Sequence, residues 1–156
     1  VKTGALIVIE RKESLKDFER TGIEVDGVVT NQLLINIFEH NTPLHDGAVV
    51  VRGNRVTYAT CYLPLSDNLD LSKELGTRHR AGVGVSETTD SLTLIVSEET
   101  GGISMAYEGE LLRHLSAEEL RDKMRKIMNL NGEEDARGLH KRKGKNKAKG
   151  EKKDTE

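Results

Sequence analysis

Residues 47–63 read GAVVVRGNRVTYATCYL, and this stretch determines the fold that we predict. Its first part, residues 47–52, is an apolar β-branched run typical of a strand. Gly53-Asn54 is a two-residue hairpin signal, and residues 55–63 alternate in polarity as a partner strand does. Because the strands of a hairpin are antiparallel, the sheet that contains them cannot be purely parallel.

Strand-like and helix-like segments precede this hairpin. Residues 5–9 form an apolar run that predicts a strand buried on both faces. Ser14 is the expected N-cap of a short helix that turns Leu15 and Phe18 toward the core. Residues 31–39 carry apolar side chains at helical spacing, and the helix that they predict ends before the next proline.

The segments after the hairpin complete an α/β pattern. We expect a helix over residues 75–85, strands over 91–96 and 103–107, and an extended piece over 110–115. Ser116 and Glu119 form a capping box before a last helix. The apolar stripe of that helix is Leu120, Met124, Ile127 and Met128. About six strands and four helices predict a mixed central β-sheet flanked by helices.

Charge is distributed unevenly along the 156 residues. Nine of the 24 basic residues but only three of the 26 acidic ones lie in residues 137–156, so residues 1–136 carry a net charge of about −8. The basic end has almost no apolar side chains, so we predict a folded domain over residues 1–130 and a disordered basic tail over residues 131–156. The acidic body argues against a nucleic-acid-binding fold, although a basic tail can touch nucleic acid or an anionic membrane.

The cysteine content, the lengths of the apolar runs and the start of the chain limit the classes of protein to which the sequence can belong. Cys61 is the single cysteine, which excludes an intramolecular disulfide and a thiolate zinc cluster. No apolar run reaches the roughly 18 residues of a membrane-spanning helix. Because the chain begins without methionine directly before a strand, we expect it to be part of a longer protein.

His45-Asp46-Gly47 places an acid directly before a glycine at the start of an expected strand. Open α/β sheets bind ligands at strand ends, where an acid can point into a cleft and a glycine lets a ligand approach the backbone. The alternative is an ordinary turn, because Asp-Gly pairs are common in turns.

Residues 76–80, Gly-Thr-Arg-His-Arg, bring a hydroxyl, two guanidiniums and an imidazole to the expected start of a helix. A helix N-terminus favours anions, and arginine donates paired hydrogen bonds to phosphate oxygens. We interpret this segment as a phosphate-binding site, and the alternative is a solvated basic patch.

Two further clusters follow expected strands. Residues 97–102, Ser-Glu-Glu-Thr-Gly-Gly, can hold Mg²⁺ or Mn²⁺ through phosphates, or form an acidic hairpin loop. Tyr62-Leu63-Pro64 offers a face for adenine, or packs at the rim of the core. Walker, Rossmann, nucleophile-elbow and zinc-protease motifs are absent. We expect structural or surface roles for His40, His114 and His140.

Taken together, residues 44–48 (Leu-His-Asp-Gly-Ala), 76–80 and 97–101 resemble the diadenylate cyclase (DAC) domain family. The Asp-Gly-Ala and Arg-His-Arg signatures occur in the order and spacing of that family, and the resemblance covers residues 4–128. The chain is most similar to the membrane-anchored bacterial type, whose catalytic domain follows N-terminal transmembrane helices.

The resemblance implies a diadenylate cyclase fold over residues 1–130. It also implies an enzyme that condenses two ATP molecules into cyclic di-AMP and two pyrophosphates with Mn²⁺, Mg²⁺ or Co²⁺. One pocket of this size holds one ATP, so the second comes from the facing subunit of a head-to-head homodimer. The full-length protein is then expected at the cytoplasmic face of the bacterial cell membrane, attached only through a missing N-terminal region. This fragment is expected to be soluble, with no nucleic-acid partner.

Family roles transfer residue by residue. The catalytic candidates are Asp46, Arg78 and His79, and Asp46 either takes the proton of the 3′-hydroxyl or holds the metal. The metal candidates are His45, Asp46 and Glu99. The substrate-binding candidates are Gly47, Ala48, Tyr62, Leu63, Gly76, Thr77, Arg78, His79, Arg80, Ser97 and Glu98. Within that set, Tyr62 and Leu63 seat the adenine, and Arg80 braces its loop or reaches a phosphate.

Three other functions are compatible with parts of the sequence. The main alternative is a non-catalytic module that binds ATP or cyclic di-AMP, which has no use for the acid at Asp46. A metal-dependent phosphohydrolase built on His45, Asp46 and Glu99 lacks the second cluster of a two-metal site. A scaffold whose basic tail binds RNA or membrane is the third.

Overall fold

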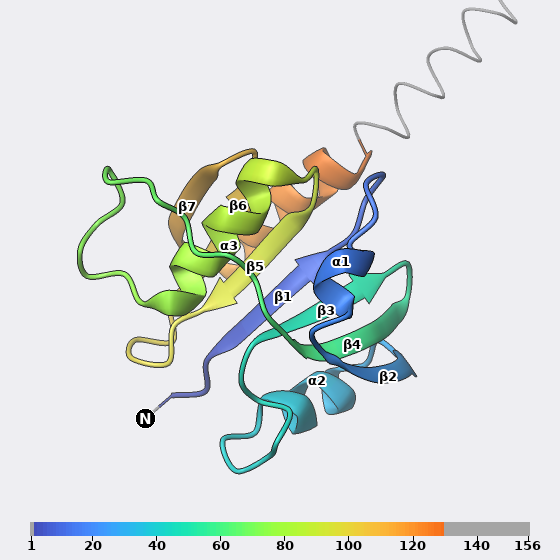
Figure 1. Ribbon diagram of the computed structural model, residues 1–156. Coiled ribbons are helices and arrows are strands. Elements are labelled where there is room, and N and C mark those ends of the chain that lie inside the picture. The colour runs from blue at the N-terminus through green and yellow to red at the C-terminus, as the bar shows by residue number, and fades with distance from the viewer. Residues whose placement is uncertain (1, 130–156) are drawn as a thin grey trace, which may run out of the picture. The chain divides into compact units, whose positions relative to one another are not determined.

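The computed structural model describes residues 2–129 (Figure 1). The chain divides after Ser116 into two compact units, and the described part of the second is a helix over residues 117–129, directly after Ser116 as predicted. The elements of the first unit are β1 (Ala5–Ile9), α1 (Lys16–Glu19), β2 (Ile23–Val28), α2 (Asn31–Phe38), β3 (Ala48–Arg52), β4 (Arg55–Cys61), α3 (Thr77–Thr88), β5 (Leu92–Val96), β6 (Ile103–Tyr107) and β7 (Glu110–Leu115). The tail predicted over residues 131–156 lies outside the described residues.

The seven strands of the first unit form one mixed sheet in the order β2-β4-β3-β1-β5-β6-β7. β1 and β3 are parallel, with Ile7 opposite Val49, and the other neighbouring pairs are antiparallel. β3 and β4 form the hairpin predicted at Gly53-Asn54, where Gly53 has a φ of 61°. The predicted α/β class with a mixed central sheet is confirmed.

Sequence periodicity did not predict β2, the edge strand. Its side chains are exposed or half-buried, and its pairing with β4 shifts register between Glu24 and Gly27. Asp26, inside this irregular segment, has a φ of 49°. A bulge of this kind interrupts the polarity alternation by which a strand is recognised.

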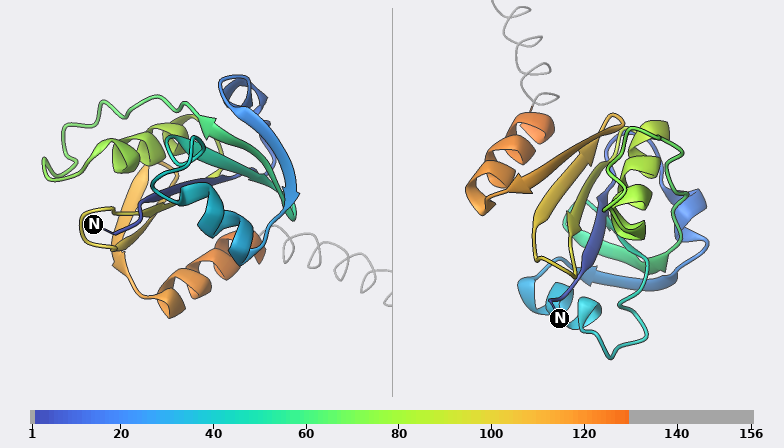
Figure 2. Two further views of the ribbon diagram at one scale, coloured as in Figure 1. Left: turned by 90° about the horizontal axis from the view of Figure 1, so that it is seen from below. Right: turned by 90° about the vertical axis from the view of Figure 1, so that its left-hand side faces the viewer.

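Apolar side chains cover both faces of the sheet, as predicted for β1. On one face, Leu6 and Val8 belong to the same core cluster as Val83 of α3. On the other face, Ala5 belongs to the cluster that contains Phe38 of α2. Figure 2 shows α3 and α2 on opposite sides of the strands. The sheet is therefore a buried layer between helices.

Gly84 allows α3 to lie against the segment that follows β4. A Cβ at this position would overlap the carbonyl oxygen of Pro64. The backbone N–H of Ser66 also donates to the carbonyl of Arg80, with an N–O distance of 2.9 Å. This backbone contact anchors the helix whose first turn carries the Arg-His-Arg motif.

The helix starts differ in detail from the predictions. Ser14 is not an N-cap, because α1 begins only after Leu15, whose backbone N–H is held by the Glu10 carboxylate. α3 begins at Thr77 rather than at residue 75, with Gly76 as its N-cap. Within residues 2–129, no helix is both long enough and apolar enough to cross a membrane.

Candidate active site

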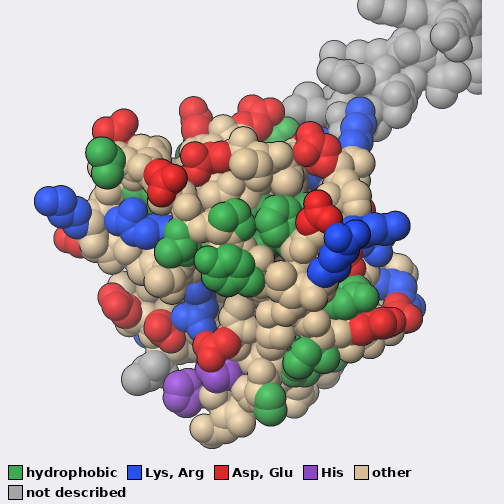
Figure 3. Space-filling model, in the orientation of Figure 1, with side chains coloured by type: hydrophobic (Ala, Val, Ile, Leu, Met, Phe, Trp, Pro, Cys, Tyr) green, Lys and Arg blue, Asp and Glu red, His purple; other side chains and the backbone are tan. Residues whose placement is uncertain are grey.

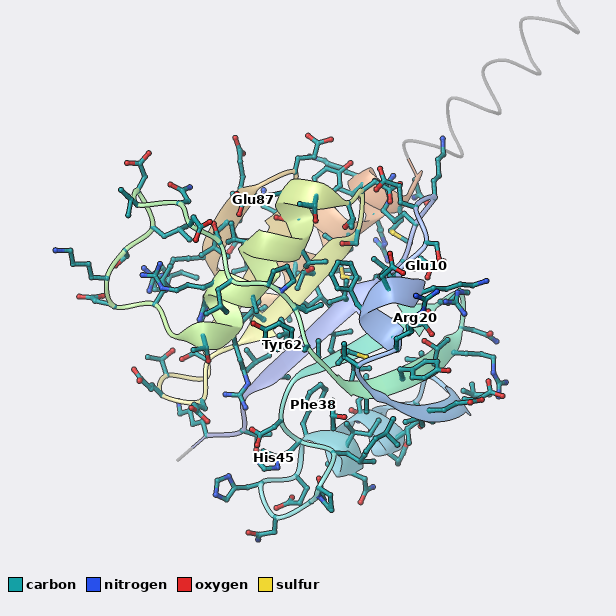
Figure 4. The ribbon with its side chains drawn as sticks, viewed as in Figure 1. Glu10, Arg20, Phe38, His45, Tyr62 and Glu87 are labelled. Carbon is teal, nitrogen blue, oxygen red and sulfur yellow. The ribbon has the colours of Figure 1, made fainter. Side chains whose placement is uncertain are left out.

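One end of the sheet collects the segments that the sequence motifs single out. β1 and β3 start at this end, and β4 and β5 finish there, because Ala48 pairs with Cys61 and Ala5 pairs with Val96. Asp46 precedes β3, Tyr62 follows β4 and Ser97 follows β5. Three segments that are distant in sequence thus meet at the same end of the strands (Figure 4).

The start of α3 and the turn after β5 border a cavity of about 370 Å³. The predicted site residues that line it are Gly76, Thr77, Arg78, His79, Ser97, Glu98 and Glu99. No side chain caps α3, and its first turn contains no acidic residue. The free N–H groups and positive dipole end of this helix are therefore available to an anion.

Arg78 is held between β1 and the turn after β5. Its Nη1 lies 3.1 Å from Oε2 of Glu98, and its guanidinium packs so closely on Gly4 that a Cβ there would stand 2.8 Å from Cζ. Its Nε is buried and has no hydrogen-bond partner among the described residues. Since an unsatisfied buried N–H is costly, an acceptor supplied by a ligand would stabilise this arrangement.

His79 is buried in the wall of the same cavity. Burial lowers the pKa of its imidazole, and the positive charges of Arg113 and Arg78 lower it further, against the opposite effect of Glu99. His79 is therefore neutral at pH 7 and presents one hydrogen-bond donor and one acceptor.

Hydrogen bonds within residues 97–102 order the acidic turn. The Ser97 hydroxyl accepts from the backbone N–H groups of Glu99 and Thr100 at 3.2 and 3.3 Å. Lys2 also holds the turn: its backbone N–H donates to the Glu98 carbonyl, and its Nζ donates to the Thr100 carbonyl. Because the Ser97 hydroxyl oxygen accepts in both of these hydrogen bonds, its proton can be donated to a ligand.

His45 and Asp46 do not line this cavity, and the Asp46 side chain is 84% exposed. Nδ1 of His45 lies 2.6 Å from the Thr42 carbonyl oxygen, which can only accept, so this nitrogen carries a proton. Nε2 lies 3.3 Å from Oδ1 of Asp46. In the neutral imidazole, a nitrogen lone pair thus faces a carboxylate, and the two atoms offer mixed N,O ligation to a cation.

His40 lies beside His45, with ring centroids 5.5 Å apart. Figure 3 shows histidine side chains (purple) gathered at one place on the surface. The predicted metal residues are divided between the His45–Asp46 pair and Glu99 in the cavity wall. Within residues 2–129, no three His, Cys, Asp or Glu side chains are grouped so that they can hold a metal.

The remaining predicted substrate-binding residues differ in their exposure to solvent. Tyr62 is 69% exposed, whereas Ala48 and Leu63 are part of the buried core. Gly47 has a φ of 79°, and a Cβ there would stand 2.9 Å from the Cys61 carbonyl oxygen, so this glycine is required by the packing of β3 against β4. Arg80 donates to the Ser72 carbonyl at 3.2 Å, which is the bracing contact expected as one of its two roles.

Eight other residues line the cavity that were not among the predicted site residues: Glu74, Leu75, Val96, Thr100, Gly102, Ser104, Arg113 and His114. His114, expected to be structural or superficial, therefore borders the candidate site. Residues 110–115 contain no recognisable motif, and only the pairing of β7 with β6 brings them to the cavity. A sequence pattern carries no signal for such a non-local contact.

The comparisons with known proteins agree with this arrangement. Residues 1–111 match the family described as DAC, DisA bacterial checkpoint controller nucleotide-binding. Cyclic di-AMP synthase CdaA of Bacillus subtilis is 57% identical over 121 residues, which are 78% of this chain and 44% of the relative. A diadenylate cyclase of Listeria monocytogenes is 58% identical over 119 residues, 76% of this chain and 44% of the relative.

Solved structures are also similar. A double mutant of DacA from Staphylococcus aureus has a TM-score of 0.78 and 48% identity, covering 80% of this chain and 83% of that chain. A hypothetical membrane spanning protein from Bacillus cereus has a TM-score of 0.70 and 46% identity, covering 73% of this chain and 56% of that one. The matched region spans less than half the length of the Bacillus subtilis and Listeria monocytogenes relatives.

Proposed function

The chain belongs to the DAC nucleotide-binding family, and we propose that it is the catalytic part of a diadenylate cyclase. The reaction joins two ATP molecules into cyclic di-AMP. The 3′-oxygen of each ATP forms a bond to the α-phosphorus of the other, the bond from that phosphorus to pyrophosphate breaks, and the hydroxyl proton passes to a base. Two pyrophosphates leave. Such a reaction needs a phosphate-binding pocket, a base or metal near the hydroxyl, and close positioning of two nucleotides.

The cavity between the start of α3 and the turn after β5 supports this proposal most strongly. Thr77 and the free backbone N–H groups of α3 present donors from one side, and Ser97 presents its hydroxyl from the other. Arg78 and His79 complete a set of donors suited to a triphosphate. We assign the phosphates of one ATP to this cavity and its adenine to the exposed Tyr62 at the adjoining strand end, because the Leu63 side chain is buried in the core.

Asp46 is assigned to the 3′-hydroxyl of the second ATP, as base or as metal ligand. Its carboxylate is exposed and stands outside the cavity that would hold the first nucleotide. A second protomer that presents the same edge would bring its own ATP to this carboxylate. A two-fold axis then lets one set of residues carry out both attacks.

A divalent cation fits the donors at the exposed edge. His45 and Asp46 would hold it together with phosphate oxygens, whereas Glu99 lies in the cavity wall and is not grouped with them within residues 2–129. A nitrogen donor favours Mn²⁺ or Co²⁺ over Mg²⁺. When bound, such an ion lowers the pKa of the attacking hydroxyl and offsets negative charge on the phosphates.

We place the parent protein at the cytoplasmic face of the membrane. The similarity to a membrane spanning protein from Bacillus cereus and the greater length of the curated relatives support a longer parent chain.

Incubation with ATP and Mn²⁺, Mg²⁺ or Co²⁺ tests the proposed reaction. We expect a product with the mass of cyclic di-AMP and release of two pyrophosphates for each product molecule. Absence of cyclic product with all three ions at high protein concentration would contradict the proposal.

A further inference from the structure

A β-bulge interrupts the pairing of β7 with β6 beside the cavity. Met105 of β6 pairs with Leu112, and Ile103 pairs with Leu115, so the single residue Ser104 lies opposite two residues of β7. The two residues are Arg113 and His114, and His114 has a φ of 58°. Bulges redirect side chains and are common beside active sites.

The bulge changes which side chains reach the cavity. In a regular strand, Arg113 and His114 would point to opposite faces of the sheet. Instead, both line the cavity together with Ser104. Arg113 is also close enough to His79 that its charge lowers the pKa of that buried imidazole.

Arg113 differs from Arg78, the other guanidinium of the cavity, in its partners. Arg78 is paired with Glu98 at 3.1 Å. The Arg113 guanidinium forms no hydrogen bond or ion pair with any residue that the structure describes. An unpaired guanidinium in the wall of a cavity favours an anionic ligand, because its planar fork donates paired hydrogen bonds to phosphate oxygens.

The position of β7 indicates which part of a nucleotide Arg113 would meet. Strand β3, which follows Asp46, and strand β7 are on opposite sides of β1 in the sheet, and β7 lies two strands beyond β5. Neighbouring strands are about 4.8 Å apart, so β7 is about 10 Å from β5, the strand that Ser97 follows. The distal phosphates, rather than the base or the reacting α-phosphate, would extend toward this side.

We propose that the bulge residues, and Arg113 above all, form a subsite for the β- and γ-phosphates of ATP and for the pyrophosphate that they become. The nucleotide identity rests on the proposed function, whereas polyphosphate binding does not require turnover. Arg113 is a substrate-binding residue in this scheme, with its main effect on KM for ATP rather than on kcat.

Calorimetric titrations of ATP, AMP and inorganic pyrophosphate into the wild type, Arg113→Gln and Arg113→Lys test the subsite. Loss of charge-assisted hydrogen bonds should weaken pyrophosphate and ATP binding by Arg113→Gln about ten- to hundredfold and leave AMP binding unchanged. Arg113→Lys should recover part of the loss. Arg20→Gln, a change at an exposed arginine on α1 that does not line the cavity, is the matched control.

Three outcomes separate this subsite from the cyclase activity. Equal pyrophosphate binding by the wild type and Arg113→Gln overturns the subsite even if the wild type produces cyclic di-AMP. No measurable pyrophosphate binding by the wild type also overturns it. A selective loss of pyrophosphate and ATP binding in Arg113→Gln supports it even if no cyclic product forms, and in that case only the cyclase assignment fails.

Discussion

The two parts of the candidate site differ in how completely one chain forms them. On the phosphate side, one chain forms a cavity that is open to solvent on one side: the start of α3, the turn at residues 97–102 and the bulge of β7 border it, and His79 is buried in its wall. The acid side is open, because the Asp46 carboxylate is largely exposed and lies outside that cavity.

The difference indicates a division of labour. A cavity that one chain forms by itself can select and hold one nucleotide through polar groups that are already in place. The exposed Asp46 carboxylate, at the end of the strands, does not border the phosphate cavity of its own chain. Asp46 could act in bond formation when a second protomer covers this end of the strands, as two-fold association of identical chains would do.

The largest expected effect is the loss of turnover when the exposed Asp46 is changed. Asp46→Asn removes the proposed base or metal ligand and should lower the rate of cyclic di-AMP formation by about 100-fold or more. ATP binding, measured by calorimetry, should change little because the phosphate cavity is intact. Asp17→Asn is the matched control, since the Asp17 side chain is similarly exposed at 87% but lies on α1. Parallel loss of ATP binding and turnover in Asp46→Asn would assign Asp46 to binding.

An intermediate effect, on stability, is expected for the anchoring of α3, because this helix forms one wall of the phosphate cavity. Gly84→Ala places a Cβ against the backbone carbonyl of Pro64, so the helix or the facing segment must move. We expect a loss of about 1–3 kcal/mol in the free energy of unfolding, measured with urea. Gly82→Ala is the matched comparison on the same helix, where the nearest atoms belong to the Ile95 side chain, which can adjust. A larger loss for Gly82→Ala would contradict the anchoring role of Gly84.

The smallest expected effect is the pH dependence that arises from His79. Its pKa is lowered in the folded chain, so near the reference value of 6.5 the unfolded chain binds a proton that the folded chain does not. This contribution to stability is complete above pH 6.5 and is lost as the pH falls through 6.5 toward the lowered pKa. His79→Gln should flatten the dependence of the unfolding free energy on pH in this window. His40→Gln, a change at an exposed histidine, serves as the control, and equal slopes for His79→Gln and the wild type would refute the effect.

Local patterns were sufficient for most of the fold. The hairpin at Gly53-Asn54 and the buried run of β1 were predicted from turn chemistry and periodicity alone. β2 was missed because a bulge at Asp26 breaks its alternation. The N-cap at Ser14 was wrong because α1 begins only after the buried Leu15.

The candidate site was predictable only where a motif is local. The segments at residues 76–80 and 97–102 were each recognised from their own chemistry, and the structure brings them to one cavity. Arg113 and His114 reach that cavity through strand pairing and a register shift, which depend on non-local contacts. The packing of Gly47 against the backbone of β4 was not predicted, and a role of Gly47 toward a ligand stays a prediction.

Mixing wild-type chains with Asp46→Asn chains at constant total protein tests the central claim, that two protomers each supply half of the reaction. A mixed pair can complete only one of the two bonds, so after subunit exchange cyclic di-AMP should form in proportion to the square of the wild-type fraction. At equal amounts, the rate should be about one quarter of that of the wild type. A rate that falls only in direct proportion to the wild-type fraction would show that a single chain closes the ring alone, and would contradict the account.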